Sequence, residues 1–335
     1  MSTVSRRLFV VLLVAFVGLP IAAQAQPAPA KKPPLQIIPG KVIVPTDNMR
    51  RPWGELVSID LATRTGKFRN EGTNEIQSFT VMPYAELLHH ATLGDLQDYR
   101  VGERAIFRLH PNEAGEWVWL TYIQDEMNFL NGHKEYYWVD KFDAATGTLT
   151  CTDANADKSY VRTEGIPILV NAETRVWKGG QPAKLADLKV GEKIRTKTHG
   201  TGEGKTRVVW ELFLDDESLL KFQAEQIVAH KERMQREGLP GYVDERGEKQ
   251  LKLTIFPEAR DYVDQLKAGR NVTVAPAGAD RKPISEPATA KIAAVAKEGR
   301  NTVVTLDFES SPNVGFKPAG LFRLWLDPAQ SASAK

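Results

Sequence analysis

The sequence predicts a mainly β protein made of two or three small closed barrels and one long connecting helix. Short runs of β-branched and aromatic residues, separated by turn residues, fill most of the chain and are too short for helices. A unit of about 85 residues occurs twice, which indicates tandem copies of one small domain. Each small sheet is expected to close on itself, because closure removes the exposed edge strands.

The composition is that of a globular protein. Of the 335 residues, 42% are hydrophobic and 26% are charged, which excludes the collagen-like, coiled-coil and disordered classes. The single cysteine, Cys151, excludes an intramolecular disulfide and a zinc site built from cysteines. Stability must therefore come from packing.

Residues 1–25 have the pattern of a signal peptide. Arg6 and Arg7 precede an apolar run from Leu8 to Leu19, and Ala23–Ala25 offers a small-residue cleavage site. The run is too short for a good membrane span, so we expect a periplasmic or secreted protein without a membrane span after signal removal. Both the general secretory and the twin-arginine export routes stay open. Signal removal leaves 42 basic and 42 acidic residues, and this balance argues against a nucleic-acid partner.

The rest of the chain divides by composition and by hydrophobic pattern. A Pro-rich spacer comes first, and two barrel units, a connecting helix, a third barrel and a disordered tail follow it. In this order, the expected segments are 26–49, 50–130, 134–217, 218–241, 250–327 and 328–335.

The repeat shows at three matched places in the two barrel units. Each place combines turn residues with the start or end of a strand-like run. The matched segments are Val57–Gly66 with Val139–Gly147, Val101–Arg104 with Val190–Lys193, and Ile123–Glu126 with Leu214–Glu217.

Three segments are predicted to be helical, two of them from apolar residues at helical spacing. Two short helices are predicted to begin at Pro83 and at Pro257, since proline suits the first turn. The third and longest is predicted from Ser218 to Glu237, ended by Gly238. Because its apolar residues are few and its charges many, we expect a solvated connector between barrels, with a partner-docking helix as the alternative.

The first barrel unit resembles the small OB-type barrels of exported bacterial proteins, distantly including periplasmic copper carriers. The residues that carry the resemblance are Phe79–Val81, Asp95–Leu96, Val101–Leu109 and Trp117–Ile123. The resemblance implies tandem OB/SH3-like barrels and gives no function. The copper carriers hold their metal through a histidine, a methionine pair and a capping tryptophan before the Phe-Thr strand. The corresponding stretch, Asn74–Ser78, has none of these, so the resemblance does not extend to copper.

Aromatic residues supply the first candidate site. Trp117 with Trp119, and Tyr136 with Trp138, each share one face of a predicted strand. Such platforms stack on sugars or bases, or bind a protein partner. The alternative is that they line the barrel cores or seal one barrel against the next.

Met82, His89 and His90 supply the second candidate site, because thioether and imidazole ligands suit a soft or borderline transition metal. On the predicted helix, however, His89 and His90 would point about 100° apart and would not easily share one ion. Two acidic groups, Asp125–Glu126 and Asp215–Glu217, suit acid-base chemistry or calcium, although neither has the spacing of a calcium loop.

No nucleophile motif accompanies these residues. The sequence therefore predicts an exported, non-catalytic binding or scaffold protein of the cell envelope, without a cofactor and with an envelope protein or a glycan as the partner. A periplasmic metal-binding carrier and an envelope hydrolase are the alternatives. The hydrolase requires that Asp125 and Glu126 converge in a cleft.

Overall fold

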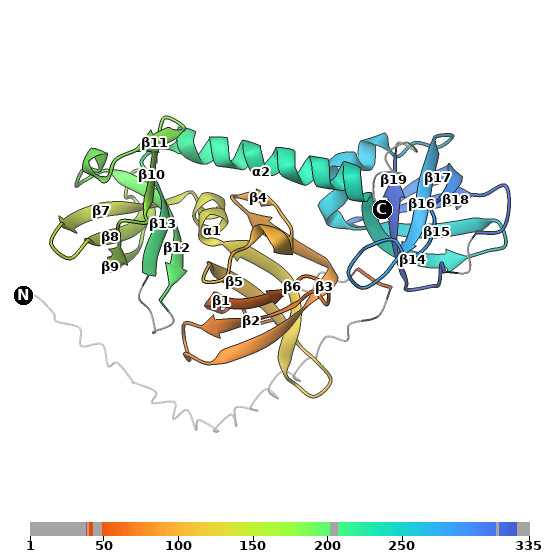
Figure 1. Ribbon diagram of the computed structural model, residues 1–335, viewed down its shortest axis with the longest axis horizontal. Coiled ribbons are helices and arrows are strands. Elements are labelled where there is room, and N and C mark those ends of the chain that lie inside the picture. The colour runs from red at the N-terminus through yellow and green to blue at the C-terminus, as the bar shows by residue number, and fades with distance from the viewer. Residues whose placement is uncertain (1–37, 39, 43–48, 202–206, 313–314, 327–335) are drawn as a thin grey trace, which may run out of the picture. The chain divides into compact units, whose positions relative to one another are not determined.

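The computed structural model describes residues 38, 40–42, 49–201, 207–312 and 315–326 (Figure 1). The expected signal at 1–25, most of the spacer at 26–49 and the tail at 328–335 lie outside these residues. Small barrels and one long helix make up the described part, so the predicted fold class is confirmed. Within it, none of the helices combines the length and the apolar character that a membrane span requires.

The first barrel closes through five strands. Its ring runs β2-β1-β5-β6-β3 and returns to β2, with β3 and β6 parallel and the other pairs antiparallel. This is the strand order of an OB-type barrel. Phe68 and Phe107 stack in the core with their ring centroids 4.2 Å apart. The elements are β1 Trp53–Asp60, β2 Thr65–Asn70, β3 Ile76–His89, β4 Thr92–Leu93, the 3-10 helix η1 Leu96–Asp98, β5 Arg104–Pro111 and β6 Trp117–Asp125.

The second barrel repeats this order through β13-β12-β7-β8-β9, closed by a parallel bridge between β9 and β13. Its elements are β7 Glu135–Asp143, β8 Thr148–Asn155, β9 Val161–Leu169, β10 Arg175–Lys178, β11 Gln181–Ala183, η2 Leu185–Asp187, β12 Lys193–Gly200 and β13 Arg207–Phe213. Gly102 and Gly191 have φ of +91° and +88°, and their amides donate to Leu56 and Val139 in equivalent strands. The matched segments Val101–Glu103 and Val190–Glu192 are therefore turns that need the left-handed conformation of glycine.

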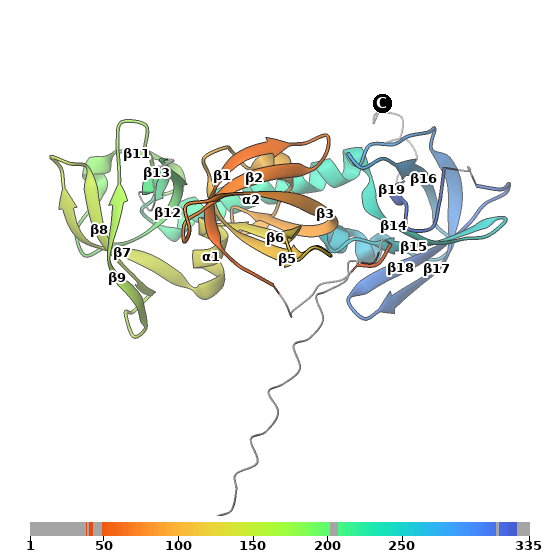
Figure 2. The same ribbon diagram turned by 90° about the horizontal axis from the view of Figure 1, so that it is seen from below.

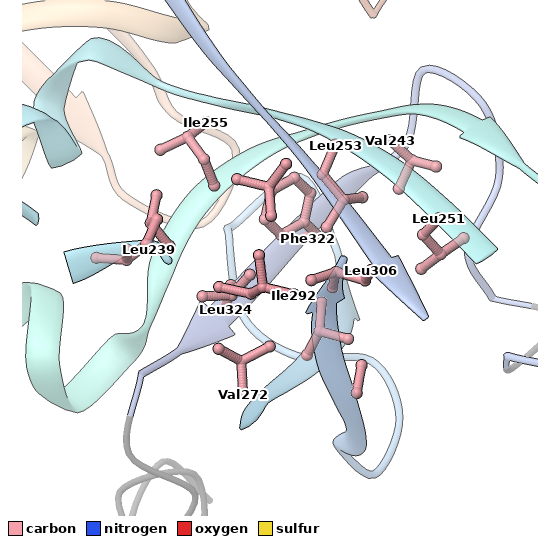
Figure 3. Close-up of a cluster of buried hydrophobic side chains, with 14 of the residues drawn as sticks. Leu239, Val243, Leu251, Leu253, Ile255, Val272, Ile292, Leu306, Phe322 and Leu324 are labelled. Carbon is pink, nitrogen blue, oxygen red and sulfur yellow. The ribbon is translucent and has the colours of Figure 1, made fainter. Parts of the chain in front are cut away.

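The third barrel has six antiparallel strands in the order β14-β15-β18-β17-β16-β19 (Figure 2). This order differs from that of the first two barrels, so it is not another copy of the repeat. The elements are β14 Leu239–Arg246, β15 Gln250–Ile255, η3 Pro257–Gln265, β16 Asn271–Ala277, β17 Ala288–Glu298, β18 Asn301–Asp307 and β19 Leu321–Trp325. Figure 3 shows apolar side chains from all six strands pointing into one shared core.

The helix predicted at Pro83 is wrong, because residues 83–89 continue strand β3. The pairing of β3 with β6 shifts register between Val81 and Glu86. Around this bulge the strand is buried on both faces, and Tyr84 packs against Tyr242 and Phe256 of the third barrel. The buried positions therefore do not alternate, so that the apolar residues mimic helical spacing.

The long helix α2, Asp216–Glu237, forms as predicted, but one of its faces is not solvated. Gln226, His230 and Arg233 are buried. Arg233 Nη2 donates to Asp98 of the first barrel at 2.6 Å, and His230 Nε2 lies 2.9 Å from the Glu258 carbonyl of the third barrel. Lys221 Nζ donates to the Gly180 carbonyl of the second barrel at 2.7 Å. The helix therefore contacts all three barrels through polar side chains, which a search for apolar residues does not detect.

Candidate functional site

A pocket of about 600 Å³ lies where the first barrel, the end of α2 and the third barrel meet. We call it the arginine pocket. Its walls carry five cationic side chains against three acids. The cations are Arg64, Arg236, Arg281, Lys282 and Arg323, and the acids are Asp95, Glu237 and Asp280.

Arg64 enters the pocket from the turn between β1 and β2. Its backbone has a left-handed φ of +52°, and its side chain reaches the N-cap of η1. There Arg64 Nη2 donates to Asp95 Oδ1 at 3.0 Å, and the same oxygen accepts the amide of Leu96 at 2.8 Å. Burial disfavours the Asp95 carboxylate, but the charges of Arg64 and Arg281 outweigh burial and hold its pKa well below the usual range.

Arg281 comes from the loop between β16 and β17 and is 4% exposed. Its guanidinium pairs with both carboxylate oxygens of Glu258 at 3.2 and 2.9 Å and donates to the Pro83 carbonyl of the first barrel. Burial lowers the pKa of Arg281, yet the charges of Glu258 and Asp95 raise it overall. Arg281 therefore stays charged while it connects the third barrel to the first.

Arg323 on β19 lines the pocket and is buried. It donates to the carbonyls of Arg281 at 2.8 Å and Gly238 at 2.9 Å, and pairs with Glu237 at 3.3 Å. Burial, followed by the charge of Arg281, lowers the pKa of Arg323 to about 10. The charge of Arg281 likewise adds to burial in lowering the pKa of Arg64. The guanidinium groups thus repel one another, and an anion among them would relieve this repulsion.

Two donors in this network are left over. Within the described part of the chain, the Nε atoms of Arg64 and Arg281 are buried and have no hydrogen-bond partner. A buried donor without a partner costs about 1–3 kcal/mol. The protein itself therefore does not satisfy all the hydrogen-bonding capacity of the pocket.

The aromatic residues predicted as a platform lie on two different barrels. Trp117 and Trp119 pack, half-buried, against the first core, and the Arg50 guanidinium lies 4.3 Å from the Trp117 ring centroid. Tyr136 and Trp138 lie half-buried on β7 of the second barrel. Each pair shares a strand, as its spacing predicts, but none of the four lines the arginine pocket. Ligand binding by these aromatic residues stays a prediction.

Cations also cover the rings on β7. Lys193 Nζ and the Arg195 guanidinium lie 4.4 and 4.2 Å from the centroid of Tyr136, and Lys158 Nζ lies 4.7 Å from that of Trp138. Tyr136 also borders a separate cavity of about 250 Å³.

The residues predicted to bind metal separate into two places. Met82 belongs to the apolar core of the first barrel. His89 and His90, by contrast, come together with Asp125, with one ligand atom of each within 4.8 Å of the others. The prediction that their spacing keeps these histidines apart is wrong, because it depended on a helix that does not form.

The two acidic groups lie at helix starts. Asp125 Oδ1 accepts the Asn128 amide at 2.8 Å and caps α1, Glu126–His133, while Asp215 Oδ1 caps α2 through the Ser218 amide at 2.9 Å. Glu126 is fully buried and accepts from four side chains of the first two barrels. Both carboxylates are fully buried and held by protein donors, and the envelope hydrolase stays an alternative prediction.

Reasoning from the sequence missed the arginine pocket entirely. One signal was present: Arg323 interrupts the apolar strand Leu321–Trp325. It lies on the opposite side of the strand from Phe322 and Leu324, which face the core, yet it is 3% exposed. A charge on the outer face of a strand becomes buried only where another element covers that face.

A scan of protein-family models and a search of curated proteins found no match to this chain. The class is therefore defined by the fold and the site together. The chain is a tandem small-barrel protein with two OB-type repeats, a third barrel of different strand order and a cationic pocket at their junction with α2.

Proposed function

We propose that the protein is an exported, non-catalytic binding protein of the cell envelope whose arginine pocket takes a small anionic ligand. The observation that carries the proposal is the cavity of about 600 Å³ with its excess of cationic side chains. This volume lies in the usual range of small-molecule sites. The ligand class is a compound with a carboxylate or a phosphate group, because the planar guanidinium pairs with both through two parallel hydrogen bonds.

The chemistry of the lining favours binding over turnover. The described lining contains no serine, cysteine or histidine that could act as a nucleophile or as a base near neutral pH. The pKa of Asp95 is held low by its arginine partners, so this carboxylate is a poor proton acceptor. Export is supported by the pattern of residues 1–25.

Calorimetric titration with inorganic phosphate, a sugar phosphate and a uronic acid tests the proposal. Arg236 and Lys282 lie at the exposed rim, so their substitution spares the buried ion pairs. The double variant Arg236→Gln/Lys282→Gln should lower affinity about tenfold or more, because a hydrogen bond to a charged group contributes about 1.5–3 kcal/mol.

Lys297→Gln is the matched control. This residue is exposed on β17, outside the pocket, and its loss should leave the affinity unchanged. The proposal is wrong if none of the three anions binds at millimolar concentration. It is also wrong if the double variant binds as tightly as the control.

A further inference from the structure

We propose that His89, His90 and Asp125 form a binding site for a divalent transition-metal ion, zinc or copper, and that the Lys197 ammonium competes with that ion. The site lies between the first barrel, the second barrel and α2. It is separate from the arginine pocket, and the inference does not depend on the function proposed above.

An unusual turn brings the two imidazoles together. Leu88 pairs with Leu93 and His89 with Thr92, which leaves His90 and Ala91 as a two-residue hairpin loop. Both have left-handed φ values, +49° and +63°, in the type I′ geometry that Asn-Gly normally occupies. Neighbouring side chains on a strand point to opposite faces, but here the ring centroids of His89 and His90 are 4.0 Å apart. Backbone strain of this kind is concentrated at functional sites.

The third ligand comes from the end of β6. Asp125 Oδ2 accepts the backbone amide of His90 at 2.8 Å, which fixes the carboxylate beside the turn. Two imidazole nitrogens and one carboxylate oxygen form a ligand set that binds zinc or copper in preference to magnesium or calcium. His90 is only half-buried, so the site has a side from which an ion can enter.

A hydrogen bond from α2 sets the tautomer of His89. Gln226 Nε2 donates to the Leu93 carbonyl at 3.3 Å and to Asp98 Oδ2 at 3.0 Å, so its Oε1 is the atom that faces the imidazole. Because Oε1 only accepts, His89 Nδ1 donates to it at 3.0 Å. The Nε2 lone pair of His89 therefore faces the cluster, as in metal sites whose histidines are oriented by a second partner.

Lys197 on β12 shows that this point attracts a cation. Its Nζ lies 2.5 Å from His89 Nε2 and 3.2 Å from His90 Nε2. It also lies 3.0 Å from Glu103 Oε1. Burial, together with the charge of Lys197, lowers the pKa of His90 far below its usual range. An ion with twice the charge would take the same lone pairs, and the ammonium would keep its pairing with Glu103.

Removal of the competing ammonium tests the inference. Zinc chloride is titrated by calorimetry into the untagged chain and into Lys197→Gln. The variant should bind zinc at least about tenfold more tightly, because a like charge beside the ion is gone. The melting temperature of Lys197→Gln should fall, since Glu103 loses its buried partner, and should recover as zinc is added.

Two matched variants decide the outcome. Lys193→Gln removes a lysine from the same strand, β12, away from the cluster, and should leave zinc affinity unchanged. His90→Asn removes an imidazole but keeps a residue that accepts a left-handed turn. The gain in Lys197→Gln should therefore vanish in the His90→Asn/Lys197→Gln double variant. The inference is overturned if Lys197→Gln binds no more tightly than Lys193→Gln, or if the gain survives His90→Asn.

If Lys197→Gln does not fold, the inference is tested on the chain without that substitution. Its copper(II) complex should show electron paramagnetic hyperfine coupling from two imidazole nitrogens, and His90→Asn should retain only one. A spectrum that is the same in both proteins overturns the assignment and leaves Lys197 as a polar link between two barrels.

Discussion

In the second barrel, burial disfavours the charge of one carboxyl group, that of Asp153. The Asp153 carboxyl on β8 is 6% exposed, and within the described residues its Oδ1 has no hydrogen-bond partner. Its other oxygen lies 3.8 Å from Arg162 Nε. Burial, together with the charge of Glu135, raises the pKa of Asp153 to about 6. The ionised Asp153 carboxylate therefore destabilises the folded protein above that pH.

Asp153→Asn should stabilise the protein at pH 8 by about 1 kcal/mol, because the neutral amide removes the cost of a carboxylate that is partly screened by Arg162 and solvent. The sign follows from the raised pKa. The folded state holds the proton more tightly than the unfolded state, so stability falls as the pH rises from about 4 to about 6. Urea unfolding at pH 8 and at pH 4 measures the effect, and an equal gain at both pH values would contradict it.

Cys151, the only cysteine, is fully buried on the same strand. Burial raises the pKa of its thiol to about 12. A thiol that stays protonated is a poor nucleophile, so the folded protein should not react with a disulfide reagent at pH 8. The absorbance of the released thiolate should appear only as urea unfolds the chain. Rapid labelling without denaturant would show that β8 opens locally.

At the scale of elements, the two repeats use the same device at their ends. In each, the last strand of the ring runs directly into a helix whose first amides are capped by an aspartate, Asp125 for α1 and Asp215 for α2. Asp215 has a second task, because its Oδ2 accepts the Gly179 amide of the β10–β11 hairpin at 2.6 Å. One side chain therefore fixes both the start of α2 and its position on the second barrel.

Asp215→Ala should lower the free energy of unfolding by about 1–2 kcal/mol, the usual loss for a helix cap. Asp215→Asn is the control, since asparagine caps almost as well as aspartate and should lose much less. Urea unfolding followed by far-ultraviolet circular dichroism gives both values. Equal losses in the two variants would mean that the charge of Asp215, and not its capping bond, is what matters.

At the scale of the whole molecule, buried polar links join the first two barrels. Glu126 is the centre of one link. It accepts from Arg104 at 3.0 Å in the first barrel, and from Tyr137 at 2.9 Å and Thr198 at 2.8 Å in the second. A buried carboxylate with this many donors is stabilising only while all its partners remain.

Glu126→Ala should therefore destabilise the protein by about 3–5 kcal/mol, because Arg104 keeps only Glu71 as a partner and the buried donors of the second barrel lose their acceptor. It should also weaken the coupling of the first two barrels, so that thermal unfolding in a calorimeter broadens or splits into two transitions. Glu126→Gln keeps one acceptor oxygen and should lose less. A single sharp transition in Glu126→Ala would show that α2 alone holds the barrels together.

The sequence predicted what depends on local chemistry. The turns at Gly102 and Gly191, the repeated strand pattern and the long helix are each encoded by a few neighbouring residues. The bulge in β3 was not predicted, because a register shift depends on the strand beside it. The arginine pocket was missed for the same reason: Arg64, Arg281 and Arg323 lie far apart in the chain and meet only when two barrels and α2 are in place.

The helix α2 joins the two proposed sites mechanically. Gln226 orients His89, and Glu237, eleven residues further along, pairs with Arg323. At 1.5 Å per residue these positions are about 16 Å apart on one stiff rod. A shift of α2 along its axis at one end is carried to the other. A ligand that displaces Gln226 therefore also moves Glu237 and changes the affinity of the arginine pocket. By thermodynamic reciprocity, a ligand that displaces Glu237 changes the affinity of the histidine site by the same factor.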